Sequence, residues 1–313
     1  MSGNFKNLKL ITLALLFVAC VFAQISCTRI VKHGLEAEIS ATRNVTDEAG
    51  RNVTVPGKIE RYISLAPNLT EIVYEIGAGD RLVGDTTFCD YPPEARKVEK
   101  IGDTLHPSIE KIIALRPQLV LVSTASQLEA FTSQLAQHNI AVYVTDPHDL
   151  EGVFRSIEEL GQLLNQQERA TKAVRELRKR ADSVQEAVRS VKPVTVFYQL
   201  SAEPLYTAGR DSFVTDLIQR AGGKSVTGTV PGAWPKYSAE SALAARPEVV
   251  ILPAGGSMGS ANRSVAEALK KSSAVMNGRV YQINDDYLSR PGPRSVDGLE
   301  EMARALHPEV FKQ

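Results

Sequence analysis

Two stretches of the chain resemble each other: SIEKIIALRPQLVLV from Ser108 to Val122 and SAESALAARPEVVIL from Ser238 to Leu252. Ser, Glu, Ala, Arg, Pro and Val recur in register. In both copies a serine stands where it can cap a short helix, Arg-Pro ends that helix, and the apolar run that follows is typical of a buried strand. Any layered α/β protein could repeat such a unit, so the repeat by itself indicates a fold class and leaves the function open.

Strands and helices alternate around both copies. Ahead of the first copy, YISL is a predicted strand, PNLTEIVYEIGAG an amphipathic helix and RLVGD a second strand. The alternation resumes after Pro193 with the strand VTVFYQL. Because alternating strands and helices form parallel sheets covered on both faces, we expect two Rossmann-like α/β lobes, over residues 43–148 and 193–313.

The segment between the lobes has a different composition. Residues 149–192 contain no proline, are rich in Glu, Gln, Arg, Ala and Leu, and place apolar residues three and four apart. This pattern predicts one long helix, or two nearly collinear helices, that bridges the lobes and ends at Pro193.

The first residues have the pattern of a leader for export. Two lysines precede LITLALLFVACVFA, an apolar run too short to cross a bilayer as a mature helix. We therefore expect residues 1–27 to be a signal peptide cleaved after Ala23, or a lipoprotein leader with Cys20 or Cys27 as the lipidated residue. Either form would place the protein in the periplasm or on the outer face of the cytoplasmic membrane.

Composition narrows the classes of function. The 313 residues carry 36 basic and 36 acidic side chains, so the charge balance gives no indication of a nucleic-acid partner. Cys89, the one cysteine outside the leader, is expected to be a buried thiol. The five histidines are dispersed without metal-ligand spacing, and the chain has no H-E-x-x-H pair and no P-loop. We expect no metal site, no cofactor and no enzymatic activity.

From Asp47 to Val310 the sequence resembles the substrate-binding proteins of ABC importers whose two lobes are bridged by a rigid helix and which serve cobalamin, ferric siderophores and haem. The resemblance rests on VTDEAGRNVTVPGKIERYISLAPNLTEIVYEIGAGDRLVGDT, on the two repeated stretches, and on RPGPRSVDGLEEMARALHPEVF. CDYPPEARKVEKIGD is most similar to the cobalamin-binding branch. The resemblance implies a monomer that captures a ligand between its lobes and delivers it to a membrane permease.

The resemblance also assigns a role to one glutamate in each repeated stretch. In the family an acidic residue on each lobe docks onto arginines of the two permease subunits, and Glu110 and Glu240 occupy those places. A two-fold permease presents two equivalent basic pockets, so a single-chain carrier needs two pseudo-equivalent acidic side chains. Each glutamate taken alone could instead be a carboxylate that the helix dipole favours on a solvated first turn.

Five residues are expected at the ligand, all but Tyr91 by the same resemblance. Phe88 and Tyr91 lie in TTFCDYPPEA, Trp234 is the chain's single tryptophan, and Asp286 and Arg290 are four residues apart in DDYLSRPGPR. Apolar faces with a few polar groups suit a flat macrocycle fringed by amides, such as cobalamin or a related corrinoid.

Departures from the family pattern leave alternatives open. Thr104 and Ser123 stand where known cobalamin binders have aromatic residues, and Tyr91, Tyr198 and Tyr206 could compensate. Within the family, a ferric siderophore would call for several converging Arg or Lys residues, and haem for an axial Tyr or His. A zinc or manganese carrier would need converging His and carboxylate ligands, toward which His106 is the one histidine near the expected cleft loop. From another class, an exported α/β hydrolase would need a nucleophile motif, and we identify none.

Overall fold

The first lobe is built on a sheet of four parallel strands. Its strand order is β4 (Leu82–Gly84), β3 (Tyr62–Ser64), β5 (Leu119–Ser123) and β6 (Ala141–Thr145). Its helices are α2 (Pro67–Glu75), α3 (Ile109–Ala114) and α4 (Leu128–Ala136), and the turns η1 (Gly79–Arg81) and η2 (Pro93–Lys97) are 3₁₀-helices. A hairpin of β1 (Thr42–Thr46) and β2 (Asn52–Pro56) precedes the sheet.

The second lobe contains a mixed sheet. Strands β11 (Val280–Asn284), β10 (Val249–Ala254) and β7 (Val194–Ala202) are parallel, β8 (Leu205–Thr207) pairs with β7 in the antiparallel sense, and β9 (Gly223–Ser225) pairs with its beginning. The helices are α7 (Phe213–Arg220), α8 (Ala239–Ala244), α9 (Ser273–Met276), α10 (Asp285–Ser289) and α11 (Ser295–Leu306), with η3 (Glu267–Lys271) as a 3₁₀-helix. Two α/β lobes with mainly parallel sheets confirm the predicted fold class.

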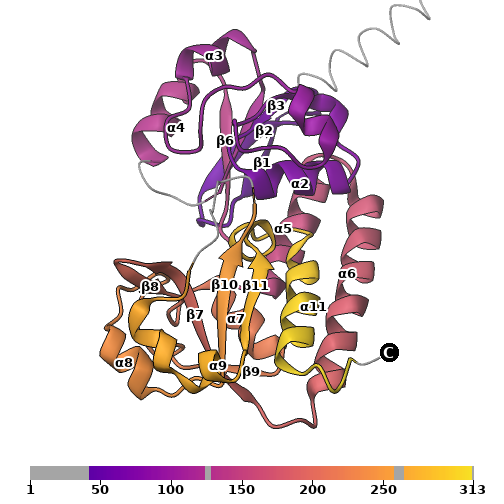
Figure 1. Ribbon diagram of the computed structural model, residues 1–313. Coiled ribbons are helices and arrows are strands. Elements are labelled where there is room, and N and C mark those ends of the chain that lie inside the picture. Colours follow the sequence, from indigo (N-terminus) through magenta and orange to yellow (C-terminus); the bar gives the residue numbers. More distant parts are fainter. Residues whose placement is uncertain (1–41, 124–127, 257–263, 312–313) are drawn as a thin grey trace, which may run out of the picture.

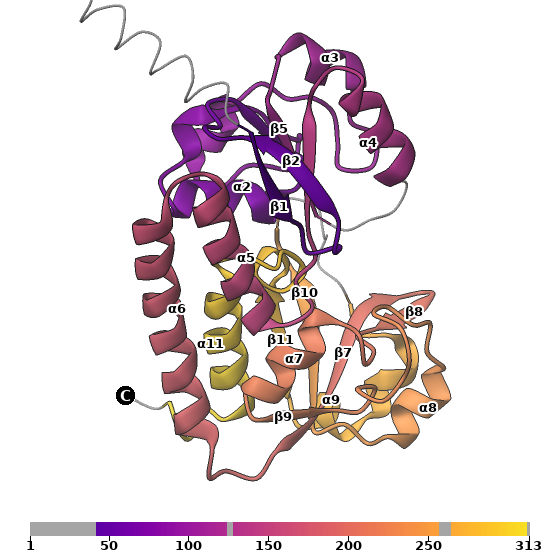
Figure 2. The same ribbon diagram turned by 180° about the vertical axis from the view of Figure 1, so that it is seen from behind.

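This computed structural model describes residues 42–123, 128–256 and 264–311. Figures 1 and 2 show the first lobe above the second, with α6 (Gln167–Val188) running along one side of both. At one end of α6, Arg169 donates a hydrogen bond to the carbonyl of Gly77 in the first lobe. Further along, Arg180 forms ion pairs with Asp297 and Glu300 of α11 in the second lobe. One helix therefore bridges both lobes.

The two repeated stretches form the same local structure. In each lobe a serine side chain caps the helix: the hydroxyl of Ser108 accepts from the N–H of Lys111, and that of Ser238 from the N–H of Ser241. After each helix the chain reaches an arginine whose backbone is in the left-handed region. The proline that follows disfavours the helical conformation at this arginine, so the helix cannot continue. The two arginines, Arg116 and Arg246, have φ of 48° and 47°.

The residue after each proline ties the unit to the neighbouring strand. The side chain of Gln118 accepts from the N–H groups of Glu60 and Arg61, just before β3. The carboxylate of Glu248 accepts from the N–H and the hydroxyl of Thr195 in β7. The repeated sequence thus specifies a helix, its end, and the register of the strand that follows.

The segment over 149–192 differs from the prediction of one helix or two collinear helices. It forms a helical hairpin of α5 (Leu150–Leu163) and α6, which lie side by side in both views (Figures 1 and 2). The chain reverses at Asn165, whose φ is 55°. Asparagine tolerates the left-handed region better than most residues, so the reversal needs no glycine or proline. Only α6 is the bridging helix.

The hairpin is closed by a contact between two small residues. A Cβ atom added to Gly161 of α5 would lie 2.3 Å from the Cβ of Ala170 in α6. No real Cβ pair comes that close, so the two helices would have to separate to admit even one methyl group. The position requires glycine although glycine disfavours a helix by about 1 kcal/mol relative to alanine.

We predict that Gly161→Ala lowers the free energy of unfolding. Overpacking of this kind costs about 1–3 kcal/mol, which exceeds the gain in helix propensity. Removing the opposing methyl group in Gly161→Ala/Ala170→Gly should recover at least half of the loss, as measured by urea unfolding. A single variant as stable as the parent protein would contradict the close approach of α5 and α6.

Candidate functional site

The loops that carry the expected ligand residues follow strands of both sheets. Parallel strands end at one edge of a sheet, and ligands of open α/β folds bind beyond that edge. Phe88 and Tyr91 follow β4. Asp286 lies in α10, the helix that follows β11, and Arg290 comes directly after that helix. The arrowheads of β10 and β11 point toward the first lobe (Figure 1). The structure thus brings these four residues to the boundary between the lobes.

An ion pair joins the lobes at this boundary. Glu71 lies in α2 of the first lobe, and its side chain is only 2% exposed. Arg294, directly before α11 in the second lobe, donates to it from Nε (2.9 Å to Oε2) and from Nη2 (2.5 Å to Oε1). Two parallel hydrogen bonds to a carboxylate are among the strongest side-chain contacts in proteins. The same guanidinium lies 4.1 Å from the centre of the Tyr91 ring.

Arg290 makes a second set of contacts between the lobes. Its side chain is 3% exposed, and its Nη1 lies 3.1 Å from Oδ1 of Asp90 and 3.6 Å from Oε1 of Glu71. Its Nη2 donates to the carbonyl of Phe88 at 3.3 Å and lies 3.1 Å from Oδ1 of Asp286. Arg290 therefore lies behind the loop that carries Phe88, where it pairs with carboxylates of both lobes.

The electrostatics of the buried carboxylate reflect two opposing effects. Burial raises the pKa of Glu71, because the charged form loses its hydration. The hydrogen bonds from Arg294 and the charges of Arg294 and Arg290 oppose this shift. The two arginines of the other lobe thus favour the charged form of this carboxylate, against the effect of burial.

A lysine anchors the loop after β4. The Nζ of Lys100 donates to Oδ1 of Asp85 at 2.7 Å and to the carbonyls of Cys89 and Ala95 at 2.8 and 3.0 Å. Burial raises the pKa of Asp85 to about 7, although the hydrogen bond and charge of Lys100 oppose it. The thiol of Cys89 is buried, as predicted. Both ends of the loop that carries Phe88 are thus fixed.

Aromatic side chains remain exposed on both lobes. Among the large apolar side chains of the described residues, the aromatic ones that are exposed are Tyr91, at 45%, and Trp234, at 40%. Trp234 lies between β9 and α8, and its ring centre is 6.2 Å from that of buried Tyr198 in β7. Rings held in place on one side and open on the other can pack against a flat apolar ligand.

The paired glutamates of the repeat are exposed in equivalent surroundings. Glu110 lies in the first turn of α3 and Glu240 in the first turn of α8. Hydrogen bonds from its own N–H and from the hydroxyl of Ser238 lower the pKa of Glu240. Helices α3 and α8 lie on the same side of the molecule, one in each lobe, away from α6 (Figures 1 and 2). The two carboxylates are therefore presented on one side.

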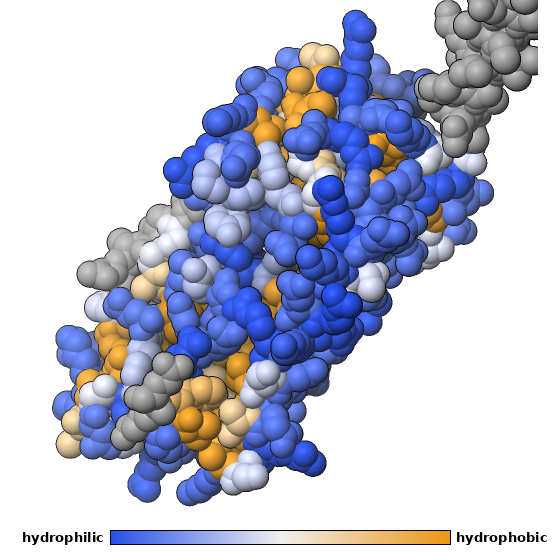
Figure 3. Space-filling view, turned by 90° about the vertical axis from the view of Figure 1, so that its right-hand side faces the viewer, coloured by the Kyte–Doolittle hydropathy of each residue, from blue (hydrophilic) through white to orange (hydrophobic). Residues whose placement is uncertain are grey.

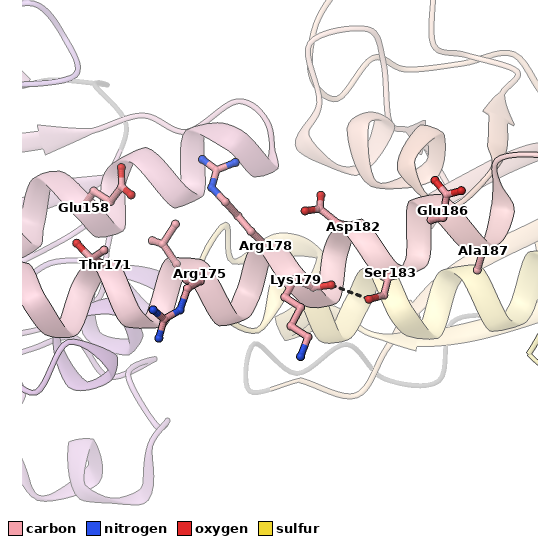
Figure 4. A pocket seen from close by; sticks show the side chains of 10 residues that line it. Glu158, Thr171, Arg175, Arg178, Lys179, Asp182, Ser183, Glu186 and Ala187 are labelled. Atoms are coloured by element: carbon pink, nitrogen blue, oxygen red, sulfur yellow. Dashed lines mark hydrogen bonds between the residues drawn. The ribbon is translucent and has the colours of Figure 1, made fainter.

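A groove of about 990 Å³ runs along the outer face of α6. Figure 4 shows that its walls are mainly long charged side chains, among them Arg175, Lys179 and Glu186, together with Glu158 of α5. The side of the molecule that carries α6 is mostly hydrophilic (Figure 3). All its lining residues belong to α5 and α6 and none to the loops at the strand ends, and we assign it no ligand.

The remaining expectations fall partly outside the described residues. The leader over 1–27 is among them. Within the part of the chain that the structure describes, no group of three or more His, Cys, Asp or Glu is placed to hold a metal ion, and no helix is long and apolar enough to cross a membrane. His106 pairs with Asp103 on the surface, at 3.3 Å.

The expectation that the chain has no nucleophile motif needs one correction. The pentapeptide GGSMG, Gly255 to Gly259, matches the G-x-S-x-G spacing of hydrolase nucleophile elbows and follows strand β10. Ser257 itself lies outside the described residues. The sequence motifs therefore do not exclude a hydrolase, and the choice between a hydrolase and a binding protein rests on the family to which the chain belongs.

Two residues of the lobe boundary were not predicted from the sequence. Glu71 lies in the amphipathic helix pattern TEIVYE, where a glutamate is ordinary, and Arg294 follows Arg290 by four residues in RPGPRS. They are 223 residues apart in the chain. The only local indication of this ion pair was the second arginine of the RPGPR stretch, to which the sequence alone assigned no role.

Comparison with known proteins identifies the family. Residues 63–287 match the family described as periplasmic binding protein. An uncharacterized ABC transporter substrate-binding lipoprotein of Bacillus subtilis, YvrC, is 30% identical over 276 residues, which cover 86% of this chain and 87% of that protein. A vitamin B12-binding protein of Vibrio cholerae is 31% identical over 255 residues, covering 80% and 90% of the two chains.

A solved structure agrees with these matches. The crystal structure of the periplasmic vitamin B12-binding protein BtuF of Vibrio cholerae superposes with a TM-score of 0.71 at 31% identity, and the match covers 82% of this chain and 99% of that one. The chain therefore belongs to the periplasmic binding protein family of ABC transporter substrate-binding proteins, which carry ligands and are not enzymes.

Proposed function

We propose that this protein captures cobalamin or a related corrinoid between its two lobes and delivers it to an ABC permease. The observation that carries the proposal is the exposure of one aromatic side chain on each lobe, Tyr91 and Trp234. The names of the relatives from Vibrio cholerae, which are vitamin B12-binding proteins, support the same ligand class.

In the proposed site the aromatic and charged residues have separate roles. Phe88, Tyr91 and Trp234 pack against the apolar faces of the corrin ring. Asp286 and Arg290 form the charged base of the site, where Arg290 fixes the carbonyl of Phe88. The loops are tied down before any ligand arrives, so little conformational freedom has to be lost on binding.

The alternative ligands within the family are a ferric siderophore and haem. A siderophore with anionic groups would require arginines or lysines that are not already paired. Arg290 and Arg294 instead face the carboxylates of Glu71, Asp90 and Asp286. This pairing favours an uncharged, amide-fringed ligand over an anionic one, while Tyr91 keeps haem as the second candidate.

The exported location and the permease partner belong to the same proposal. A leader over residues 1–27 would send the chain to the periplasm or to the outer face of the cytoplasmic membrane, with a lipid anchor if Cys20 or Cys27 is modified. Glu110 and Glu240, presented on one side of a monomer, would each meet one subunit of a two-fold permease. Exposed ion pairs add little free energy, so such contacts would mainly set the register and the association rate.

Because Trp234 is the only tryptophan, its fluorescence reports directly on the proposed site. We predict that cyanocobalamin quenches the emission of Trp234 because the corrin ring would pack against the indole. The quenching should saturate at micromolar concentrations or below, which corresponds to a binding free energy of about −8 kcal/mol or stronger. Haemin and a ferric siderophore, titrated in parallel, should bind more weakly.

The control for this titration is calorimetry on the parent protein and on Trp234→Phe. The variant should still bind cyanocobalamin but with lower affinity, because one aromatic contact is smaller. If several corrinoids produce neither saturable quenching nor heat, the corrinoid proposal is wrong. Tighter binding of haemin would move the assignment to haem.

We further predict that reversing both docking charges, in Glu110→Lys/Glu240→Lys, abolishes permease-dependent uptake of radiolabelled cyanocobalamin. Binding of cyanocobalamin in solution should stay within about twofold, because surface substitutions of this kind change folding free energy by no more than about 0.5 kcal/mol.

The matched control is Glu75→Lys/Glu176→Lys, which reverses exposed glutamates on α2 and α6. This control should transport normally. Loss of ligand binding in Glu110→Lys/Glu240→Lys would show that these residues belong to the ligand site, and normal uptake by that variant would exclude the docking role.

A further inference from the structure

Two arginines of the second lobe meet one buried carboxylate of the first lobe. Arg294 holds Glu71 with two hydrogen bonds, and Arg290 lies 3.6 Å from the same oxygen that accepts from Arg294. Nearby, the amide of Asn68 in α2 donates to the carbonyl of Pro291 at 3.1 Å. Two residues of α2, Asn68 and Glu71, thus contact residues 290–294 of the other lobe.

The same arginines also touch the loop that carries Phe88 and Tyr91. The guanidinium of Arg294 covers the Tyr91 ring, and Arg290 binds the carbonyl of Phe88 and the carboxylate of Asp90. Arginine side chains are flexible, and a buried guanidinium holds one position only where its partners fix it. Both arginines also lie near Asp286 of their own lobe, at 3.1 and 3.8 Å, and Glu71 is the carboxylate of the first lobe that both of them share.

We infer that Glu71 is a positioning residue: through Arg290 and Arg294 it sets how the lobes face each other and holds the loop Phe88–Tyr91 ready for ligand. Glu71 touches no ligand in this scheme. It forms an ion-pair latch, defined as Glu71, Arg290 and Arg294, that must loosen when the lobes separate. The kinetic part of the test below rests on the proposed corrinoid ligand, and the scattering part does not.

Because the latch is buried, neutralising one of its charges should strongly affect lobe separation and ligand release. Removing one partner of a buried, hydrogen-bonded charge pair leaves the other charge unpaired and mainly accelerates dissociation. Neutralising Glu71 should therefore let the lobes sample wider separations and release ligand faster, whereas association, which depends on encounter, should change less.

The first experiment uses Glu71→Gln in the otherwise unchanged protein. Small-angle X-ray scattering of the ligand-free variant should give a larger radius of gyration than the parent. Stopped-flow Trp234 fluorescence should show a dissociation rate for cyanocobalamin raised about tenfold or more, with an association rate changed by less than about threefold. Arg294→Lys, which keeps the charge but loses the paired hydrogen bonds, should be intermediate in both.

Two further variants distinguish the positioning role of Glu71 from a general contribution to folding stability. Asp47→Asn breaks a buried ion pair inside the first lobe, where Arg51 donates to Asp47 at 2.6 and 2.9 Å. It should lower stability without changing the radius of gyration or the dissociation rate. Glu71→Gln/Arg294→Met removes both charges, and should recover stability relative to Glu71→Gln while ligand release stays fast.

The outcomes decide the inference in either direction. An unchanged radius of gyration in both Glu71→Gln and Arg294→Lys would overturn it. So would a dissociation rate that recovers together with stability in the double variant, or an equal acceleration in Asp47→Asn. If cyanocobalamin does not bind the parent protein, the ligand proposal fails, and the scattering data still decide whether the latch sets the lobe spacing.

Discussion

The pairing of Glu71 with Arg294 is the contact on which the geometry of the site depends. Strand pairing and helix caps are local to each lobe, whereas one apolar core runs from the first sheet through α5 and α6 into the second lobe. What makes two lobes into one site is their relative position; α5 and α6 join the lobes on one side, and at the boundary itself the polar contacts gather around Glu71, Arg290 and Arg294. A buried carboxylate that faces two guanidinium groups favours one arrangement, because moving both arginines away would leave the charge of Glu71 unpaired and out of water.

The helical hairpin supports this contact from behind. Helix α6 reaches both lobes, and α5 returns the chain from the first sheet to the start of α6, so the hinge is a packed pair of helices and not a set of extended strands. Such a connection limits lobe rotation, and it suits a carrier that binds in a largely preformed cleft. The charged outer face of α6 is then explained as a solvated surface, and the groove along it needs no ligand.

Much of the fold could be predicted from the sequence, since the repeated stretch carries its own signals: a capping serine, an Arg-Pro stop and a buried strand. The reversal at Asn165 could not, because LLNQQER continues a helical pattern and only the fit of Gly161 against Ala170 shows where the chain turns. The site was predicted in part. The family resemblance led us to expect Asp286 and Arg290 at the ligand, but it did not indicate Glu71, which faces Arg290 and is distant in sequence and ordinary in its local pattern.

The central claim is that a corrinoid lies between the lobes, against Tyr91 and Trp234. A crystal structure of the protein grown with cyanocobalamin tests it most directly. The account predicts electron density for the corrin ring in contact with both side chains, with Arg294 still paired to Glu71. Density for the ligand in the groove along α6, or a ligand that contacts neither aromatic ring, would contradict it.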